Sequence, residues 1–158
     1  MAIRESVRQK RPIVLAAGVF DLLHLGHVRF LEEAKKAGGE NAELIVIVAR
    51  DRTVEKRKGE RPVMSGNQRR ALVEALEIVD EAILGFEDFD IVRVIEKIKP
   101  DVIALGHDQK SIEKMVRSVI SSKGLMIKVV KIGKFSEDEL NSSTEIKRKI
   151  IELYRREP

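Results

Sequence analysis

Residues 13–27 read I-V-L-A-A-G-V-F-D-L-L-H-L-G-H, and this stretch decides the fold. An apolar, partly β-branched run that ends in glycine is typical of a buried parallel strand, and the amphipathic segment 28–37 behind it predicts a helix. His24 and His27 therefore lie at a strand-to-helix turn, with Gly26 between them. Open α/β sheets bind ligands at the carboxyl ends of their strands, and the start of a helix offers free N–H groups to a phosphate. We expect this turn to bind phosphate.

The two histidines of this turn also have a simpler explanation, because a histidine near a helix start is often only a capping or surface residue. The chain has only three histidines, however, and two of them stand in this turn, while His107 follows a second apolar run. Gly26 lets the backbone come close to a ligand, and imidazole rings can donate hydrogen bonds to phosphate oxygens. The clustering favours ligand binding over capping alone.

Apolar runs alternate with amphipathic segments along the whole chain. Strands are expected at residues 13–17, 44–49, 81–84, 102–105 and 126–132. This alternation predicts an α/β fold, a Rossmann-like, doubly wound parallel sheet of five strands. The sequence contains no internal repeat and no Gly/Ser linker, so we expect one domain over residues 1–158 with its core at about 13–154.

Composition limits the classes of function. The chain has 158 residues, 43% of them hydrophobic, and no apolar run approaches the length of a membrane helix. It has no cysteine, which excludes a disulfide framework, a thiolate zinc site and a cysteine nucleophile. A net charge of +4 slightly favours small anionic ligands, whereas one tyrosine and five phenylalanines leave little for base stacking. We expect a cytoplasmic enzyme without a membrane partner, for which nucleic acid is an improbable ligand.

The longest polar stretch, residues 50–67, follows the second expected strand and predicts a loop rich in basic side chains. A compact domain seldom keeps so long a loop unless it is functional or mobile, although a solvated charged loop is the open alternative. The helix expected next, at 68–76, should turn Leu72, Ala75 and Leu76 inward.

Four polar segments should meet at one edge if the sheet is parallel, because each follows an expected strand or opens the last helix. They are residues 18–27, 49–51 with the basic stretch behind them, 106–109 and 141–144. In the last of these, Ser142 with Glu145 also matches a helix capping box. Hydroxyl groups at a helix start can cap the helix and donate to a phosphate as well.

The ten-residue pattern G-x-F-D-x-x-H-x-G-H resembles the cytidylyltransferase-like nucleotidyltransferase family, whose fold is of the HUP type. Within that family the chain is most similar to archaeal-type FAD synthases. The likeness rests on V-A-R-D-R-T-V at 48–54, K-R-K at 56–58 and I-K-P-D-V-I-A-L-G at 98–106. It covers residues 13 to about 150 and departs at Val19, where threonine or serine is usual, and at His107, where tyrosine is usual.

The resemblance implies transfer of AMP from ATP to FMN with release of pyrophosphate, by a homodimer. The nearest enzyme alternative is a glycerol-3-phosphate or other sugar-phosphate cytidylyltransferase that uses CTP, and the non-enzyme alternative is a nucleotide- or RNA-binding module. A phosphomonoester is already ionised at neutral pH, since its second pKa lies near 6, so such a reaction needs no strong general base. Phe86, Phe89 and Phe135 could stack on a flavin ring, although packing in the core would explain each of them.

The resemblance also implies a role for each matching residue. The catalytic residues would be His24, His27, Lys56 and Arg69, of which Arg69 would bind the triphosphate. The nucleotide would further contact Gly18, Val19, Phe20, Asp21, Gly26, Lys58, Gly106, Asp108, Ser142, Ser143 and Thr144. A divalent cation, Mg²⁺, would bridge the phosphates, with Asp21 as its candidate protein ligand.

Overall fold

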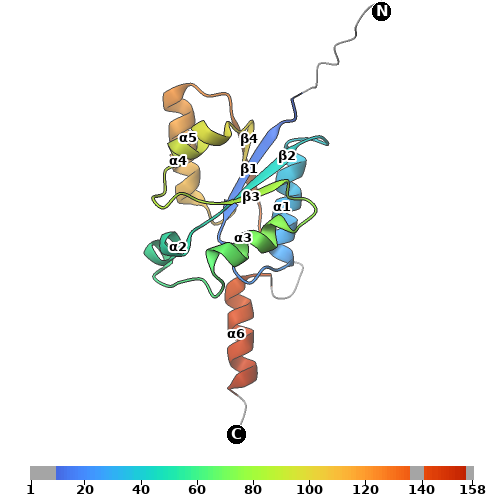
Figure 1. The fold of residues 1–158 in the computed structure, drawn as a ribbon, viewed down its shortest axis with the longest axis vertical. Helices are drawn as coiled ribbons and strands as arrows, with labels where there is room; N and C mark the ends of the chain where they lie inside the picture. Colours follow the sequence, from blue (N-terminus) through green and yellow to red (C-terminus); the bar gives the residue numbers. More distant parts are fainter. Residues whose placement is uncertain (1–9, 136–140, 156–158) are drawn as a thin grey trace, which may run out of the picture.

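The computed structural model of the chain describes residues 10–135 and 141–155 and contains a five-stranded parallel sheet (Figure 1). The strands are β1 (Ile13–Gly18), β2 (Glu43–Val48), β3 (Glu81–Leu84), β4 (Val102–Gly106) and β5 (Lys128–Ile132). They lie in the order β3-β2-β1-β4-β5, and all four pairings are parallel. The direction of winding reverses between β1 and β4, the position at which such sheets bind ligands. The predicted doubly wound fold is confirmed.

Helices cover both faces of this sheet. They are α1 (Leu25–Ala37), α2 (Asp51–Lys58), α3 (Gly66–Glu74), α4 (Ile91–Ile98), α5 (Lys110–Lys123) and α6 (Ser143–Tyr154). One apolar cluster joins the sheet to α1 and α3, and a second joins the other face to α4 and α5. The result is a three-layer arrangement in which the strand ends remain free to carry a site.

Alternation along β1 explains why both faces are covered. Val14 and Ala16 point into the cluster with α1, where Leu31 is fully buried, whereas Leu15 points into the cluster with α4 and α5. Each fully buried leucine or valine stabilises the fold by about 1.5–3 kcal/mol relative to leaving it exposed. A strand that is apolar at every position therefore needs helices on both sides, as its sequence indicates.

The prediction of one long loop at residues 50–67 is wrong. Its first half is the helix α2, which ends at Gly59 with φ +81°, and α3 begins at Gly66. Helix α2 escaped the sequence analysis because only Val54 is buried, so the segment shows no apolar repeat at helical spacing. The connection that remains is short, and it is held against the rest of the site as described below.

The inner face expected for α3 is also largely wrong. Arg69 and Val73 are the buried side chains of this helix, while Leu72 is 39% exposed and Ala75 lies at the surface. Leu76 alone packs against the core as expected. The prediction failed because it placed the apolar residues of the helix inward and the arginines outward, whereas Arg69 is buried.

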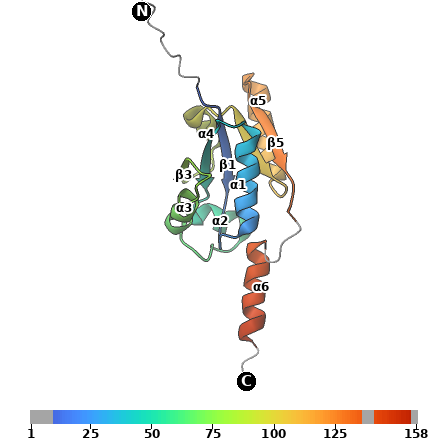
Figure 2. The ribbon, with the colours of Figure 1, turned by 90° about the vertical axis from the view of Figure 1, so that its right-hand side faces the viewer.

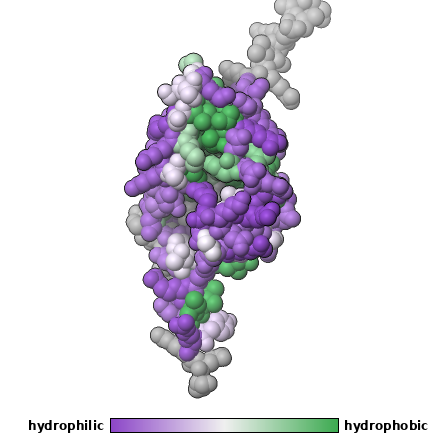
Figure 3. Space-filling model, turned by 90° about the vertical axis from the view of Figure 1, so that its left-hand side faces the viewer, coloured by the Kyte–Doolittle hydropathy of each residue, from purple (hydrophilic) through white to green (hydrophobic). Residues whose placement is uncertain are grey.

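Helix α6 continues away from the sheet below α1, and none of its described residues is buried (Figures 1 and 2). Its first turn lies against the turn after β1, and Lys147 in the next turn reaches Glu60 at 3.5 Å. The face that carries α2, α4 and α5 is largely hydrophilic, with apolar surface gathered in its upper half (Figure 3). Within the described ranges, no helix has the length and apolar character that crossing a membrane requires.

Candidate active site

The turn between β1 and α1 has an unusual backbone. Phe20 and Leu22 adopt positive φ angles of 54° and 49°, a left-handed conformation that costs non-glycine residues free energy. Phe20 is only 3% exposed and packs into the core, and its ring would collide with a Cβ at Gly18, at 2.9 Å. The turn is therefore fixed from inside, and Phe20 has a structural role that the sequence analysis did not assign.

Arg69 holds the same turn in place through hydrogen bonds to backbone carbonyl groups. Its guanidinium is fully buried and donates to the carbonyl oxygens of Val19, Ala49 and Met64 at 2.5, 2.8 and 2.9 Å and to Asp51 Oδ1 at 2.6 Å. These bonds join the ends of β1 and β2 to the starts of α2 and α3. The expectation that Arg69 binds the triphosphate does not fit this arrangement, because the residue is fully buried and four of its five N–H groups donate within the protein. It positions the site instead.

Asp21 is likewise engaged inside the protein. It is 4% exposed, and its two carboxylate oxygens accept the backbone N–H groups of Val63 at 2.7 Å and Met64 at 3.0 Å. Its own backbone carbonyl accepts the hydroxyl of Ser143. Asp21 thus ties the connection before α3, and the start of α6, to the turn. The expected role as a metal ligand does not fit this arrangement, and the described residues contain no cluster of three or more metal-ligating side chains.

His24 and His27 form a stacked pair at the start of α1. Their ring centroids lie 3.7 Å apart with 24° between the ring planes, and His27 also meets the edge of Phe20 at 5.3 Å. The backbone N–H of His24 donates to Nδ1 of His27 at 3.3 Å. Since Nδ1 accepts, a neutral His27 carries its proton on Nε2. The ring is therefore set to act as a hydrogen-bond donor.

The environment keeps both histidines neutral at physiological pH. Burial, the adjacent His24 and the nearby Lys58 lower the pKa of His27 to about 3, against the opposing effect of Asp21. Burial also lowers the pKa of His24, although Glu145 at the start of α6 partly offsets it. A bound polyphosphate would favour the charged form of each ring.

The start of α6 lies against the start of α1. A Cβ at Gly26 would meet the backbone oxygen of Asn141 at 2.7 Å, so glycine permits this close approach. Ser142 accepts the N–H of Glu145 at 3.1 Å and so caps α6, as the capping-box pattern predicts. Thr144 is exposed at the surface. Two helix starts thus point their positive ends at one region, an arrangement that favours an anion.

The lysines of α2 separate to two places. Lys58, in the last turn, lies near enough to His27 to lower its pKa. Lys56 instead borders a cavity of about 250 Å³ between α2, the β3–α4 connection and α5. The two were expected to act together on phosphates, and the structure brings only Lys58 toward the histidines.

The end of β4 joins the same edge through Gln109. Its side-chain oxygen accepts the N–H of Gly106 at 2.8 Å, and its side-chain nitrogen donates to the carbonyl oxygen of Ala17 at the end of β1, at 2.9 Å. Asp108 and His107 are exposed beside it. The expected contact of Gly106 and Asp108 with the nucleotide stays a prediction. Gln109 is a further missed residue, and its position directly after a strand was the available signal.

Hydrogen bonds therefore connect all four segments that the sequence predicted would converge. Arg69 joins the first to the second, Ser143 joins the first to the fourth, and Gln109 joins the third to Ala17, the residue directly before the first. The edge can hold a polyanion among two helix starts, the neutral imidazole donors and Lys58. The carboxylates of Asp21 and Asp51 at this edge already accept hydrogen bonds within the protein.

Comparison with protein families finds a match to the cytidylyltransferase-like family over residues 15–149. A protein from Ferroglobus placidus named FAD synthase is 51% identical over 140 residues, which cover 89% of this chain and 88% of that one. Another so named, from Thermoplasma volcanium, is 46% identical over 140 residues, covering 89% and 94%. The likeness thus extends over nearly the whole of each chain.

Solved structures agree on the fold. The crystal structure of a Thermoplasma volcanium protein described as a lipopolysaccharide core biosynthesis protein superposes with a TM-score of 0.72 at 44% identity, covering 80% of this chain and all of that one. The pantoate-beta-alanine ligase of Francisella tularensis gives a TM-score of 0.60 at 15% identity over 98% of this chain and 75% of the ligase. The second likeness concerns the fold alone.

Proposed function

The chain belongs to the cytidylyltransferase-like family, and from this membership we propose that it is an FMN adenylyltransferase, which transfers AMP from ATP to FMN and releases pyrophosphate. The observation that carries the proposal is an identity of 46–51% to proteins named FAD synthase across about nine-tenths of both chains. The site is consistent with this reaction, because its groups suit a polyphosphate. The homodimer and the cytoplasmic location expected from the sequence stay predictions.

The reaction makes one bond and breaks one. An oxygen of the FMN phosphate attacks the α-phosphorus of ATP, and the bond from that phosphorus to the pyrophosphate oxygen breaks. Two ionised phosphates give two ionised phosphates, so no net proton transfer to a base is required at neutral pH. The reaction therefore needs no general base, and the catalytic demand is positioning and stabilisation of charge.

His27 is the residue best placed to meet that demand. Its Nε2–H is fixed as a donor by the hydrogen bond at Nδ1, and the stacked His24 limits rotation of the ring. A donor that is already oriented costs no reorganisation when charge develops on a phosphate oxygen. Lys58 and the starts of α1 and α6 add positive potential around it.

Magnesium, where present, would enter with the nucleotide rather than on protein ligands. Both oxygens of Asp21 already accept backbone N–H groups, and the described chain shows no alternative cluster of ligating residues. Mg²⁺ retains several waters and often binds mainly through substrate phosphates. We therefore assign Asp21 a structural role in the turn. We expect the cation to bind to the polyphosphate.

The test is formation of FAD from ATP and FMN, followed by separation of the flavins and by pyrophosphate release. Parallel reactions pair CTP with glycerol 3-phosphate, and ATP with a sugar 1-phosphate. FAD formation with the first pair, at a rate well above the others, supports the proposal. Preferred turnover with CTP or a sugar phosphate contradicts the acceptor, and salt-sensitive RNA binding without any turnover would favour a binding module.

A further inference from the structure

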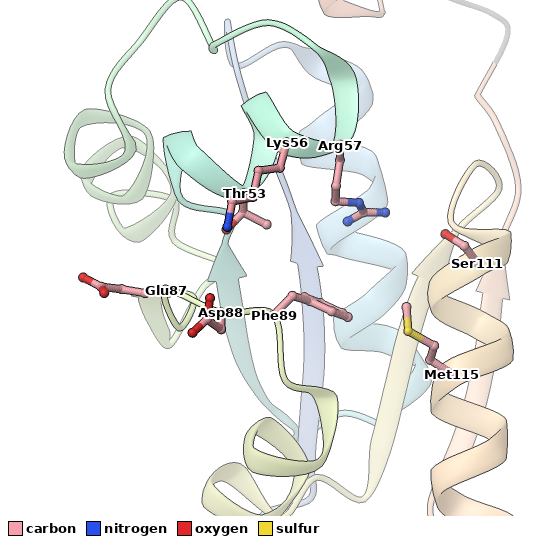
Figure 4. Close-up of a pocket in the computed structure, with 8 residues that line it drawn as sticks. All are labelled: Thr53, Lys56, Arg57, Glu87, Asp88, Phe89, Ser111 and Met115. Atoms are coloured by element: carbon pink, nitrogen blue, oxygen red, sulfur yellow. The ribbon is translucent and has the colours of Figure 1, made fainter.

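The cavity bordered by Lys56 lies between α2, the β3–α4 connection and α5. It is lined by Thr53, Lys56, Arg57, Glu87, Asp88, Phe89, Ser111 and Met115. Figure 4 shows Phe89 extending from the β3–α4 connection toward Met115 on α5, with Arg57 on the side of α2. At about 250 Å³ the cavity falls below the roughly 300–1,000 Å³ of sites that enclose a whole ligand. It suits one part of a larger substrate.

Two side chains of this cavity are exposed although they are large and apolar. Phe89 is 46% exposed and Met115 is 39% exposed, and they line the same cavity from separate elements. An exposed aromatic ring beside a thioether offers a surface on which a flat ring can stack. A ligand that covered this pair would bury apolar surface that is exposed to water in the free protein, and this burial would favour binding.

Of the phenylalanines that the sequence analysis considered, only Phe89 is available for stacking. Arg93 lies 4.2 Å and Lys97 lies 5.5 Å from the ring centroid of Phe86, which also packs against the core. Phe135 packs against the other core cluster. Phe89 has one cation nearby, Arg57, at the longer distance of 5.9 Å.

The cavity combines an apolar side with a cationic side. Phe89 and Met115 form the first, and Lys56 and Arg57 supply the cations of the second, which also carries the carboxylates of Glu87 and Asp88. An isoalloxazine ring matches this division, since one end is a dimethylbenzene and the other carries two carbonyl oxygens that accept hydrogen bonds. Adenine has no carbonyl oxygen, and glycerol phosphate has no apolar part to place on Phe89.

The position of the cavity relative to the histidines also fits. Lys56 borders the cavity, and Lys58 at the end of the same helix lies near His27. A substrate that placed its ring in the cavity could follow the last turn of α2 and bring its other end to the phosphate site. FMN has this form, with a flexible ribityl chain between its ring and its phosphate.

We infer that this cavity, with Phe89 and Met115 as its stacking surface, holds the isoalloxazine ring of the acceptor and so determines selectivity for a flavin. The inference rests on the proposed function, because it names a subsite for that acceptor. It predicts that substitutions in the cavity change KM for FMN and leave KM for ATP unchanged.

The experiment compares KM for FMN and for ATP in the wild type, Phe89→Ala, Phe89→Trp and Met115→Ala. Loss of an aromatic stacking partner at an exposed site should raise KM for FMN about tenfold in Phe89→Ala, with KM for ATP unchanged within twofold. Phe89→Trp should restore binding, because it keeps the stacking face. Met126→Ala is the control, since Met126 is 99% exposed and lies outside the cavity.

Riboflavin supplies a readout without turnover, because it carries the ring and the ribityl chain but no phosphate. Quenching of its fluorescence by the wild-type protein should weaken about tenfold in Phe89→Ala and stay unchanged in Met126→Ala. An unchanged KM for FMN in Phe89→Ala, or an equal rise in KM for ATP, overturns the inference while the wild type still makes FAD. A wild type that makes no FAD overturns the proposed function and the inference with it.

Discussion

The turn that carries the histidines and the cavity beside helix α2 are built in opposite ways. On the histidine side, the turn after β1 is held by a fully buried arginine, a buried aspartate and a buried phenylalanine, whose polar groups are hydrogen-bonded within the protein. On the cavity side, Lys56, Arg57, Phe89 and Met115 reach into a space lined by surface side chains. The phosphate site is thus rigid in the absence of ligand, and the cavity is adaptable.

This difference separates chemistry from selectivity. Phosphate transfer needs donors that do not reorganise, and a network of internal hydrogen bonds provides that rigidity. Choice of acceptor needs contacts that can change without disturbing the fold, and exposed side chains on a connection and on helix faces provide those. Substitutions on the two sides should therefore differ in kind. Substitutions of the buried residues beneath the turn should lower stability. Substitutions of the histidines should lower turnover, and substitutions in the cavity should weaken the binding of one substrate.

The largest expected effect is that of Arg69→Met. Removal of the guanidinium leaves three carbonyl oxygens and Asp51 without their donor, which should lower the free energy of unfolding by about 3–5 kcal/mol. Arg69→Lys should restore little, because an ammonium group cannot reproduce the planar fork. Urea unfolding measures both variants.

Arg70→Met is the matched control for this change. Arg70 is next on the same helix, and its exposed ion pair with Glu74 should contribute less than about 1 kcal/mol. A stable but inactive Arg69→Met would contradict the structural role and restore the sequence-based expectation that Arg69 contacts the triphosphate.

His27→Ala should affect turnover where Arg69→Met affects stability. Loss of one oriented donor to a transition state costs about 2.7–4 kcal/mol, so kcat should fall by about a hundredfold to a thousandfold. The unfolding midpoint should change little, since His27 is only partly buried. His107→Ala serves as the control, because this exposed histidine stands at another segment, and its kcat should stay within twofold. Near-normal turnover in His27→Ala would remove this residue from the mechanism.

Asp21→Asn tests whether the carboxylate binds metal or supports the turn. The amide group must turn an N–H toward the N–H of Val63 or of Met64, which should lower the free energy of unfolding by about 1–3 kcal/mol. The concentration of Mg²⁺ that gives half-maximal rate should be the same as in the wild type. A large increase in that concentration, with normal stability, would return Asp21 to the role of a metal ligand.

Several features of this division were legible in the sequence. The continuous apolar runs predicted the five strands, and polar segments that follow strands predicted the shared edge, because parallel strands bring their carboxyl ends together. The histidine pair and the cap at Ser142 were predicted from local spacing for the same reason. These properties depend on residues close in the chain or on the topology alone.

Other features required the three-dimensional structure. The positive φ angles of Phe20 and Leu22 go against local preference and persist through contacts with distant residues. The burial of Arg69 depends on carbonyl groups up to 50 positions away, as its bond to Val19 shows. Helix α2 lacks an apolar repeat, so the separation of Lys56 from Lys58 was invisible while the segment was taken for a loop.

The smallest effect in this series concerns pH and the depressed pKa of His27. The unfolded chain takes up a proton on this residue near pH 6.5, whereas the folded protein does so only near pH 3, so the neutral ring is compatible with the native state and the charged ring is not. Stability is therefore full above pH 6.5 and decreases as the pH falls below it, by at most about 1.4 kcal/mol per pH unit from this group. Carboxylates titrate near pH 4, so the interval from pH 6.5 to 5 reports mainly on histidines.

Urea unfolding across that interval should show a shallower slope in His27→Gln than in the wild type, with the remainder due to His24. Phe89→Ala should keep the full wild-type slope, because Phe89 is not among the groups that lower the pKa of His27. An equal slope in the wild type and in His27→Gln would mean that the ring of His27 is solvated and that its surroundings do not hold it neutral.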